Sequence, residues 1–346
     1  MAQIDSLLRM AAEHRSSDVH LATGNSVLFR QFGRLKKVDS PVLTAETAKA
    51  LIYEILTPGQ RKRLEENLQL DFGYDIKGVS RFRGNVVLQR KGLDATFRVV
   101  PIKIPTMDEL GLPKIVKTVS DYHQGMILVT GATGQGKSTT LAAIIDHVNS
   151  TRPVHILTIE DPIEFVHPIK RGIVNQRQLG AHTRSFANAL RAALRQDPDV
   201  IMVGELRDVE SIRMAVTAAE TGHLVLGTLA TSSGPKTVDR LIDSFPGDEQ
   251  SQIRGMLADG LRAVVTQKLL PRIDKKGMVL AVEILIGTVP VTNMIRLEKT
   301  FQLPSVMQIS RAHGMQLMDD SIGQLLQSSL IDRETAIQFA ENKKVS

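Results

Sequence analysis

The stretch Gly131-Ala132-Thr133-Gly134-Gln135-Gly136-Lys137-Ser138 decides the fold, because it fits the phosphate-binding pattern G-x-x-x-x-G-K-[ST]. The apolar residues 126–130 before it predict a buried strand, and residues 139–145 after it predict a helix. In such a strand–loop–helix unit, the glycines allow backbone N–H groups to face phosphate oxygens at the positive end of the helix. The sequence therefore predicts a nucleotide site.

We expect different residues of this loop to bind different parts of the nucleotide. We expect residues 131–139, with Thr139 in the first turn of the helix, to surround the nucleotide phosphates. Lys137 has the length to reach the β- and γ-phosphates, and the hydroxyl of Ser138 can hold Mg²⁺. The expected ligands are therefore a nucleoside triphosphate and Mg²⁺.

Composition limits the class of protein. The length of 346 residues allows two domains, and the absence of cysteine excludes disulfide scaffolds and thiolate metal sites. The formal charge of +6 suits nucleic acid, anionic lipid, or an oligomer with arginines that face phosphates. With 3 tyrosines and no tryptophan there is no stacking platform for single strands, so we favour the oligomer and expect no direct nucleic acid partner.

Membrane features are not expected. Residues 1–17 carry charges throughout and contain no apolar core of a signal peptide. No apolar run approaches the roughly 20 residues that a membrane-spanning helix needs. We expect a cytoplasmic protein that meets a membrane only through partners.

The first hundred residues predict a small α+β domain. Helical periodicity covers residues 4–14 and 44–56, the latter capped by Thr44; Pro58-Gly59 is expected to break that helix before another over residues 60–67. Period-two alternation predicts antiparallel strands over three further segments, residues 70–76, 80–89 and 95–100. Prolines at 101 and 105 predict a linker, placed over residues 101–113.

The remaining residues, 114–346, predict an α/β domain. Strands expected at 126–130, 154–160, 200–203 and 224–229 alternate with helices expected at 138–149, 185–196 and 209–221. Such alternation is typical of a parallel sheet flanked by helices. One more strand is expected at 278–285, and short helices follow from residue 290.

Acidic residues follow two of these strands. Ligands of open α/β sheets bind beyond the carboxyl ends of the strands, where Glu160, Asp161 and Glu164 would face the γ-phosphate. We predict that Glu164 is the base that orients and deprotonates the attacking water, whereas Glu160 and Asp161 can equally cap or pair. Glu205, after four apolar residues, is expected to bind Mg²⁺ through water or to assist the base.

A histidine and a group of arginines complete the candidate site. His223, between a helix and a strand, is predicted to sense the γ-phosphate, although a lone histidine is more often structural. Arginines cluster in the strand region of the first domain and form either a solvated face or groups that reach a neighbouring subunit's nucleotide; they are Arg81, Arg83, Arg90 and Arg98. A head-to-tail contact of that kind closes into a ring.

These residues resemble those of a known family, the hexameric ATPases of type II/IV secretion and type IV pili, and most of all its retraction ATPases of the PilT type. The resemblance covers nearly the whole chain. It is carried by the phosphate-binding loop and by the following segments: 17–21, 81–83, 97–98, 158–165, 190–191, 197–199, 204–205, 218–223, 314–316 and Asp319.

The resemblance implies a PAS-like first domain, a RecA-like ATPase domain with C-terminal helices, and a sixfold ring. It implies Mg²⁺-dependent ATP hydrolysis at subunit interfaces that drives pilus retraction and twitching motility. The implied partners are a platform protein of the inner membrane and a paralogous retraction ATPase, with the ring peripheral at the cytoplasmic face of that membrane. Catalytic roles would fall on Lys137, Ser138, Glu164, Glu205 and His223, with Arg81, Arg83 and Arg98 as groups supplied in trans.

The chain departs from the family pattern at several positions. Gln135 stands where serine is common, which a backbone cradle should tolerate. Ala230 stands where the family usually has a second histidine, and Thr292 and Leu297 replace an arginine and a glutamate.

Three functions therefore remain open: a principal retraction motor, an auxiliary or regulatory paralogue of it, and a secretion or DNA-translocating ATPase. The leading hypothesis is the retraction motor.

Overall fold

The computed structural model describes residues 3–14, 16–31, 34–100 and 103–341, whose contacts divide the chain into two compact units. The first unit comprises Met1–Lys103 together with Pro162–Val166. The second comprises Ile104–Asp161 and His167–Ser346. Residues 101 and 102 of the expected linker lie outside the described residues.

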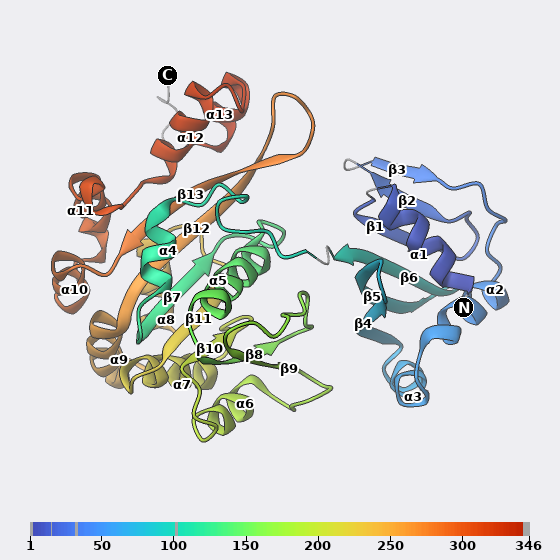
Figure 1. The fold of residues 1–346 in the computed structure, drawn as a ribbon, viewed down its shortest axis with the longest axis horizontal. Helices are drawn as coiled ribbons and strands as arrows, with labels where there is room; N and C mark the ends of the chain where they lie inside the picture. The colour runs from blue at the N-terminus through green and yellow to red at the C-terminus, as the bar shows by residue number, and fades with distance from the viewer. Residues whose placement is uncertain (1–2, 15, 32–33, 101–102, 342–346) are drawn as a thin grey trace. The chain divides into compact units, whose positions relative to one another are not determined.

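The described part of the first unit folds as an antiparallel sheet with helices, coloured blue to cyan in Figure 1. Its strands lie in the order β3-β2-β1-β6-β5-β4. Their bounds are β1 (Asp18–Leu21), β2 (Leu28–Gln31), β3 (Arg34–Lys37), β4 (Gln69–Ile76), β5 (Ser80–Gln89) and β6 (Gly92–Val100). The helices are α1 (Gln3–Glu13), α2 (Ala45–Ile55) and α3 (Pro58–Asn67).

Local sequence explains these elements. Thr44 caps α2 by accepting the backbone N–H of Thr47, as expected. As predicted, α2 ends before Pro58-Gly59 and a second helix follows; the second begins at Pro58 rather than at residue 60, because Thr57 caps α3 and proline is well tolerated in the first helical turn. In the core, the rings of Phe72 and Phe97 pack edge to face with centroids 6.1 Å apart.

The second unit contains a mostly parallel sheet in the order β13-β12-β7-β11-β10-β8-β9. Its strands are β7 (Gly125–Thr130), β8 (His155–Glu160), β9 (Ile173–Gln178), β10 (Val200–Val203), β11 (Leu224–Leu229), β12 (Leu261–Pro271) and β13 (Met278–Ile286). Only β13 pairs antiparallel, with β12. The predicted α/β class and parallel sheet are confirmed, whereas β9 and β12 were not anticipated.

Helices cover this sheet and extend beyond it (Figure 1). They are α4 (Lys114–Ser120), α5 (Lys137–Thr151), α6 (Phe186–Ala193), α7 (Val209–Glu220), α8 (Gly234–Asp243), α9 (Gly247–Gly260), α10 (Val289–Arg296), α11 (Leu303–Ile309), α12 (Met318–Gln327) and α13 (Arg333–Phe339), with short 3-10 turns η1 (Thr300–Gln302) and η2 (Arg311–His313). The predicted caps Ser185 and Asp208 are present at α6 and α7. The expected short C-terminal helices are also present.

The direction of the strands defines two edges of this sheet. Because β7, β11, β10 and β8 run parallel, their last residues share one edge, which we call the carboxyl edge; they are Thr130, Leu229, Val203 and Glu160. The residues before these strands lie along the opposite, amino edge. Side chains at the carboxyl edge can therefore act together.

Candidate functional site

The phosphate-binding loop has a backbone that requires its glycines. Gly131, Gly134 and Gly136 all have positive φ, at 138°, 81° and 83°. A Cβ atom on Gly131 would lie 2.6 Å from the carbonyl oxygen of Gln267, so no larger residue fits there. The loop follows β7 at the carboxyl edge and leads into α5, which matches the strand–loop–helix unit predicted from the sequence.

Strand β12 braces this loop through side chains. The carboxamide oxygen of Gln135 accepts the backbone N–H of Leu269 at 2.5 Å. On the same strand, Gln267 donates from Nε2 to the hydroxyl of Thr140 in α5 at 2.9 Å. Gln135, expected only to be tolerated, thus makes a specific contact that a serine is too short to reproduce in the same way.

Lys137 lies over the loop. Its ammonium donates to the carbonyl oxygens of Gly131 at 2.8 Å and Ala132 at 3.0 Å. The ammonium of Lys137 therefore lies close to the positive end of α5 and to the exposed backbone of the loop. Their arrangement is suited to bind a polyphosphate anion.

Two acidic residues at the carboxyl edge are already engaged within the unit. Glu160 is buried, and its Oε1 accepts from the hydroxyl of Thr158 at 2.7 Å and from Nε2 of Gln176 at 3.0 Å. Glu205, just past β10, accepts from Nη2 of Arg207 at 2.6 Å, and this contact raises the pKa of Arg207. Glu160 is therefore hydrogen-bonded to two neutral side chains, and Glu205 to the guanidinium of Arg207.

The structure brings Glu164 together with arginines in the first unit. Nη1 of Arg83 lies 3.6 Å from Oε1 of Glu164. Nε of Arg81 donates to the carbonyl of Ile163 at 3.0 Å, and its Nη1 pairs with Asp75. The acidic segment after β8 is thus held by the two arginines of β5 that were predicted to serve a nucleotide.

The other arginines of the first unit differ from one another. Arg98 stands directly opposite Arg83 in the β5–β6 pair, and its Nε donates to Asp18 at 3.0 Å. Arg90 lies in the turn beyond β5, at the far end of that hairpin. The expected cluster is therefore wrong for Arg90, because the hairpin carries it away from Arg83.

His223 lies at the amino edge, which corrects the expectation that it faces the γ-phosphate. Its carbonyl accepts the N–H of Gly125 at the start of β7. Its Nδ1 lies 3.1 Å from the carbonyl oxygen of Ala218, which can only accept, so this nitrogen carries a proton and donates. The length of β11 separates the two edges by about 20 Å at about 3.3 Å per residue. His223 caps the end of α7 instead.

Ala230 follows β11 at the carboxyl edge. The preceding residue, Leu229, accepts the N–H of Gly131 from the phosphate-binding loop at 3.3 Å. The position that resembles the family's second histidine is therefore beside the loop, and in this chain it carries a methyl group.

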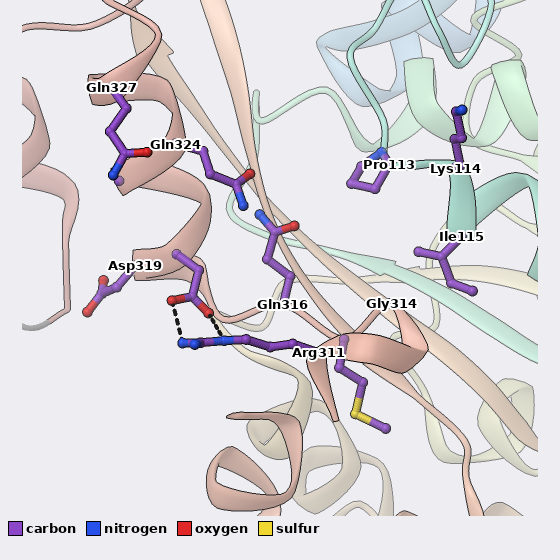
Figure 2. Close-up of a pocket in the computed structure, with 12 residues that line it drawn as sticks. Pro113, Lys114, Ile115, Arg311, Gly314, Gln316, Asp319, Gln324 and Gln327 are labelled. Atoms are coloured by element: carbon purple, nitrogen blue, oxygen red, sulfur yellow. Dashed lines mark hydrogen bonds and ion pairs between the residues drawn. The ribbon is translucent and has the colours of Figure 1, made fainter. Parts of the chain in front are cut away.

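A pocket in the second unit lies apart from the predicted site residues. Within the described residues, no three His, Asp or Glu side chains are grouped so as to hold a metal ion, and no helix is long and apolar enough to cross a membrane. The second unit has a pocket of about 600 Å³ between the start of α4 and the η2–α12 region (Figure 2). Arg311 binds Asp320 there through two hydrogen bonds. None of the predicted site residues lines it.

Similar proteins were found by sequence. The model of the family "Type II/IV secretion system protein" matches residues 1–302. The type IV pilus retraction ATPase PilT of Pseudomonas aeruginosa is 48% identical, over 98% of each chain. The type IV pilus ATPase PilU of the same organism is 36% identical, over 98% of this chain and 89% of its own length.

Similar proteins were also found by structure. A crystal structure of the pilus retraction motor PilT with bound ADP has a TM-score of 0.92 at 44% identity and covers 99% of this chain and 98% of its own. The ATPase DotB of Legionella pneumophila has a TM-score of 0.84 at 30% identity and covers 97% of this chain and 94% of its own. Because the family model spans most of the chain and these relatives span nearly all of it, this chain belongs to the type II/IV secretion system protein family.

Proposed function

We propose that this chain is an ATP-hydrolysing motor that assembles as a homo-hexamer and powers type IV pilus retraction. The observation that carries the proposal is the phosphate-binding loop with Lys137 at the carboxyl edge, in a chain that matches a retraction ATPase over 98% of its length. The ring would act at the cytoplasmic face of the inner membrane on a platform protein of the pilus.

In this proposal the nucleotide and the metal are held at the carboxyl edge. Residues 131–139 cradle the phosphates, with Lys137 on the β- and γ-phosphates. The hydroxyl of Ser138 and the carboxylate of Glu205 are hard oxygen donors of the kind that Mg²⁺ prefers, which makes them a fitting pair for this ion. When bound, Mg²⁺ would neutralise charge on the phosphates. Glu205 would then exchange its contact with Arg207 for the metal or a metal-bound water.

Residues of the first unit supply the remaining groups. Glu164 orients and deprotonates the attacking water. Arg81, Arg83 and Arg98 act on a nucleotide of the neighbouring subunit, where a guanidinium stabilises charge in the transition state. Within this chain Arg83 lies beside Glu164, so in this proposal its guanidinium exchanges that carboxylate for the phosphates of the neighbouring subunit's nucleotide.

A second candidate is an auxiliary paralogue that supports a principal retraction ATPase. Ala230 favours it, because this side chain beside the phosphate-binding loop can neither donate a hydrogen bond nor titrate. Leu297, 58% exposed, also places an apolar side chain where the retraction ATPases have a glutamate. Both candidates share the same hydrolytic site and differ in the force that one chain produces alone.

The test is complementation of a bacterium that lacks its retraction ATPases, with this chain as the sole copy. Restored twitching with the wild-type chain, and none with Glu164→Gln, supports the motor. Twitching that returns only when a principal retraction ATPase is co-expressed supports the auxiliary role. Steep, salt-sensitive stimulation of the purified ATPase by DNA would contradict both candidates and favour translocation.

A further inference from the structure

A buried carboxylate on β13 joins the first residues of two helices. The side chain of Glu283 accepts the backbone N–H of Gly234, the first residue of α8, at 2.7 Å. The backbone amide of Met318, the first residue of α12, also acts on this carboxylate and lowers its pKa. Glu283 is only 4% exposed, so one buried charge serves the positive ends of two helices that are far apart in sequence.

The first of these helices leads back to the nucleotide site. Residues 230–233 connect the carboxyl end of β11 to α8. At one end of this loop, Leu229 accepts the N–H of Gly131; at the other, Gly234 donates to Glu283. The phosphate-binding loop and Glu283 are therefore joined by a short segment that is hydrogen-bonded at both ends.

Polar side chains also line one face of the sheet between the phosphate-binding loop and Glu283. The hydroxyl of Thr130, the residue before Gly131, lies 2.8 Å from the hydroxyl of Thr266 in β12. Thr266 is the cross-strand partner of Glu283, so their side chains share one face of the sheet. All three are buried beneath the phosphate-binding loop, in a sheet whose other residues there are mostly apolar.

Helix α12 and the residues just before it are hydrogen-bonded to β13 at the two neighbours of Glu283. Val282 donates its N–H to the hydroxyl of Ser321 at 3.0 Å. Ile284 and Gln316 exchange two backbone hydrogen bonds, of 2.8 and 3.1 Å. Gln316 and Asp319, which flank Met318, line the polar pocket (Figure 2). Movement of β13 would therefore reshape this surface.

Stability alone does not account for the charge on Glu283. Burial raises its pKa to about 6, and nearby Glu341 raises it too, against lowering contributions from Lys268 and the amides of Gly234 and Met318. The folded chain thus disfavours the ionised form relative to water. A glutamine has the same shape and would avoid this cost of burying a charge. The presence of a glutamate is therefore better explained by function than by stability.

We propose that Glu283 is a positioning residue of the ATPase cycle, which makes the loop 230–233 and helix α12 respond together when nucleotide occupies the phosphate-binding loop. This inference rests on the proposed ATPase function. According to this inference, helix α12 responds to nucleotide binding, which the sequence of the helix does not indicate.

Hydrogen–deuterium exchange of the full chain, with and without MgADP, tests the proposal. We expect slower exchange in peptides that cover residues 126–140 and, at the same nucleotide concentration, residues 317–322. Unchanged exchange in residues 126–140 would contradict the proposed nucleotide function itself. Slower exchange there with no change in residues 317–322 would overturn the role of Glu283 alone.

The variant Glu283→Gln separates coupling from folding. We expect residues 126–140 to respond to MgADP as before and residues 317–322 no longer to respond. The kcat should fall by about threefold to thirtyfold while the KM for MgATP stays within about twofold, because interactions that couple sites contribute modest energies. A purely structural role would leave the nucleotide response of residues 317–322 in place.

A matched control is Asp332→Asn. Asp332 also places a carboxylate at a helix start, where it accepts the N–H of Thr335 at 2.7 Å, but it caps only α13. This variant should keep both the exchange response and kcat. Loss of the response in Asp332→Asn, or its persistence in Glu283→Gln, would overturn the proposal.

Discussion

Strand β11 begins beside His223 and ends beside Ala230, and these two residues lie at opposite edges of one parallel sheet. They belong to a single short motif, yet the strand between them holds them about 20 Å apart. Only the end of the strand meets the phosphate-binding loop, through Leu229 and Gly131. Nearness in sequence therefore says little about a shared site when a strand intervenes.

The two edges also differ in what their polar groups do. At the amino edge they terminate elements: His223 caps α7, and the carboxylate of Asp199 accepts the N–H of His155 at 2.8 Å. At the carboxyl edge, strained glycines and Lys137 surround an anion-binding place. We therefore expect substitutions at the carboxyl edge to change catalysis and those at the amino edge to change stability.

The largest effect is expected for Lys137→Ala. Removing a cation that faces developing charge on the phosphates should lower kcat by about 10²–10³-fold, with folding preserved. Steady-state ATP hydrolysis and thermal unfolding measure the two quantities. Lys170→Ala, which removes a lysine of the same unit paired with Asp146, is the control and should leave kcat unchanged. Equal losses in both variants would contradict a specific role for Lys137.

The sequence predicted those features that depend on neighbouring residues. The loop, its flanking elements and the helix caps at Thr44, Ser185 and Asp208 depend on residues within a few positions of one another. Strand β12 was not predicted, because it follows the last residue of α9, Gly260, without an intervening loop and is buried without clear alternation.

Longer-range features could not be predicted. Gln135 binds Leu269 and Glu283 binds Gly234, pairs that only the strand order brings together. His223 was misplaced because the motif gives its position along the chain but not the edge to which the strand assigns it. The roles predicted for Glu164 and Glu205 remain predictions.

A second prediction concerns stability near the carboxyl edge. The pKa of Glu283 is raised from an ordinary value of 4.5 to about 6 on folding. Its contribution to stability is therefore fully present below pH 4.5 and lost as the pH rises through 6, a change of about 2 kcal/mol. Urea unfolding from pH 4.5 to 7.5 should show Glu283→Gln gaining this amount relative to the wild type. A constant difference across that range would contradict the assignment.

A third prediction sharpens the comparison by placing a histidine at the other end of β11. In Ala230→His, the imidazole would stand beside the phosphate-binding loop and could donate to a phosphate. A hydrogen bond to a charged group contributes about 1.5 kcal/mol, so kcat should rise about tenfold if the bond strengthens in the transition state. Ala230→Phe adds bulk without a donor and should not raise kcat. An equal rise in both variants would contradict a hydrogen-bonding role.

The smallest catalytic effect is expected for His223→Ala. The variant removes the imidazole that donates to the Ala218 carbonyl, whereas the backbone N–H of His223 still donates to the same oxygen. Stability should fall by about 1 kcal/mol, the contribution of one ordinary hydrogen bond, and kcat should change by less than about twofold. Measured kcat and KM for MgATP decide the matter. A loss of kcat of tenfold or more, at a temperature where the variant is folded, would mean that the amino edge takes part in hydrolysis, and the separation of the two edges by function would fail.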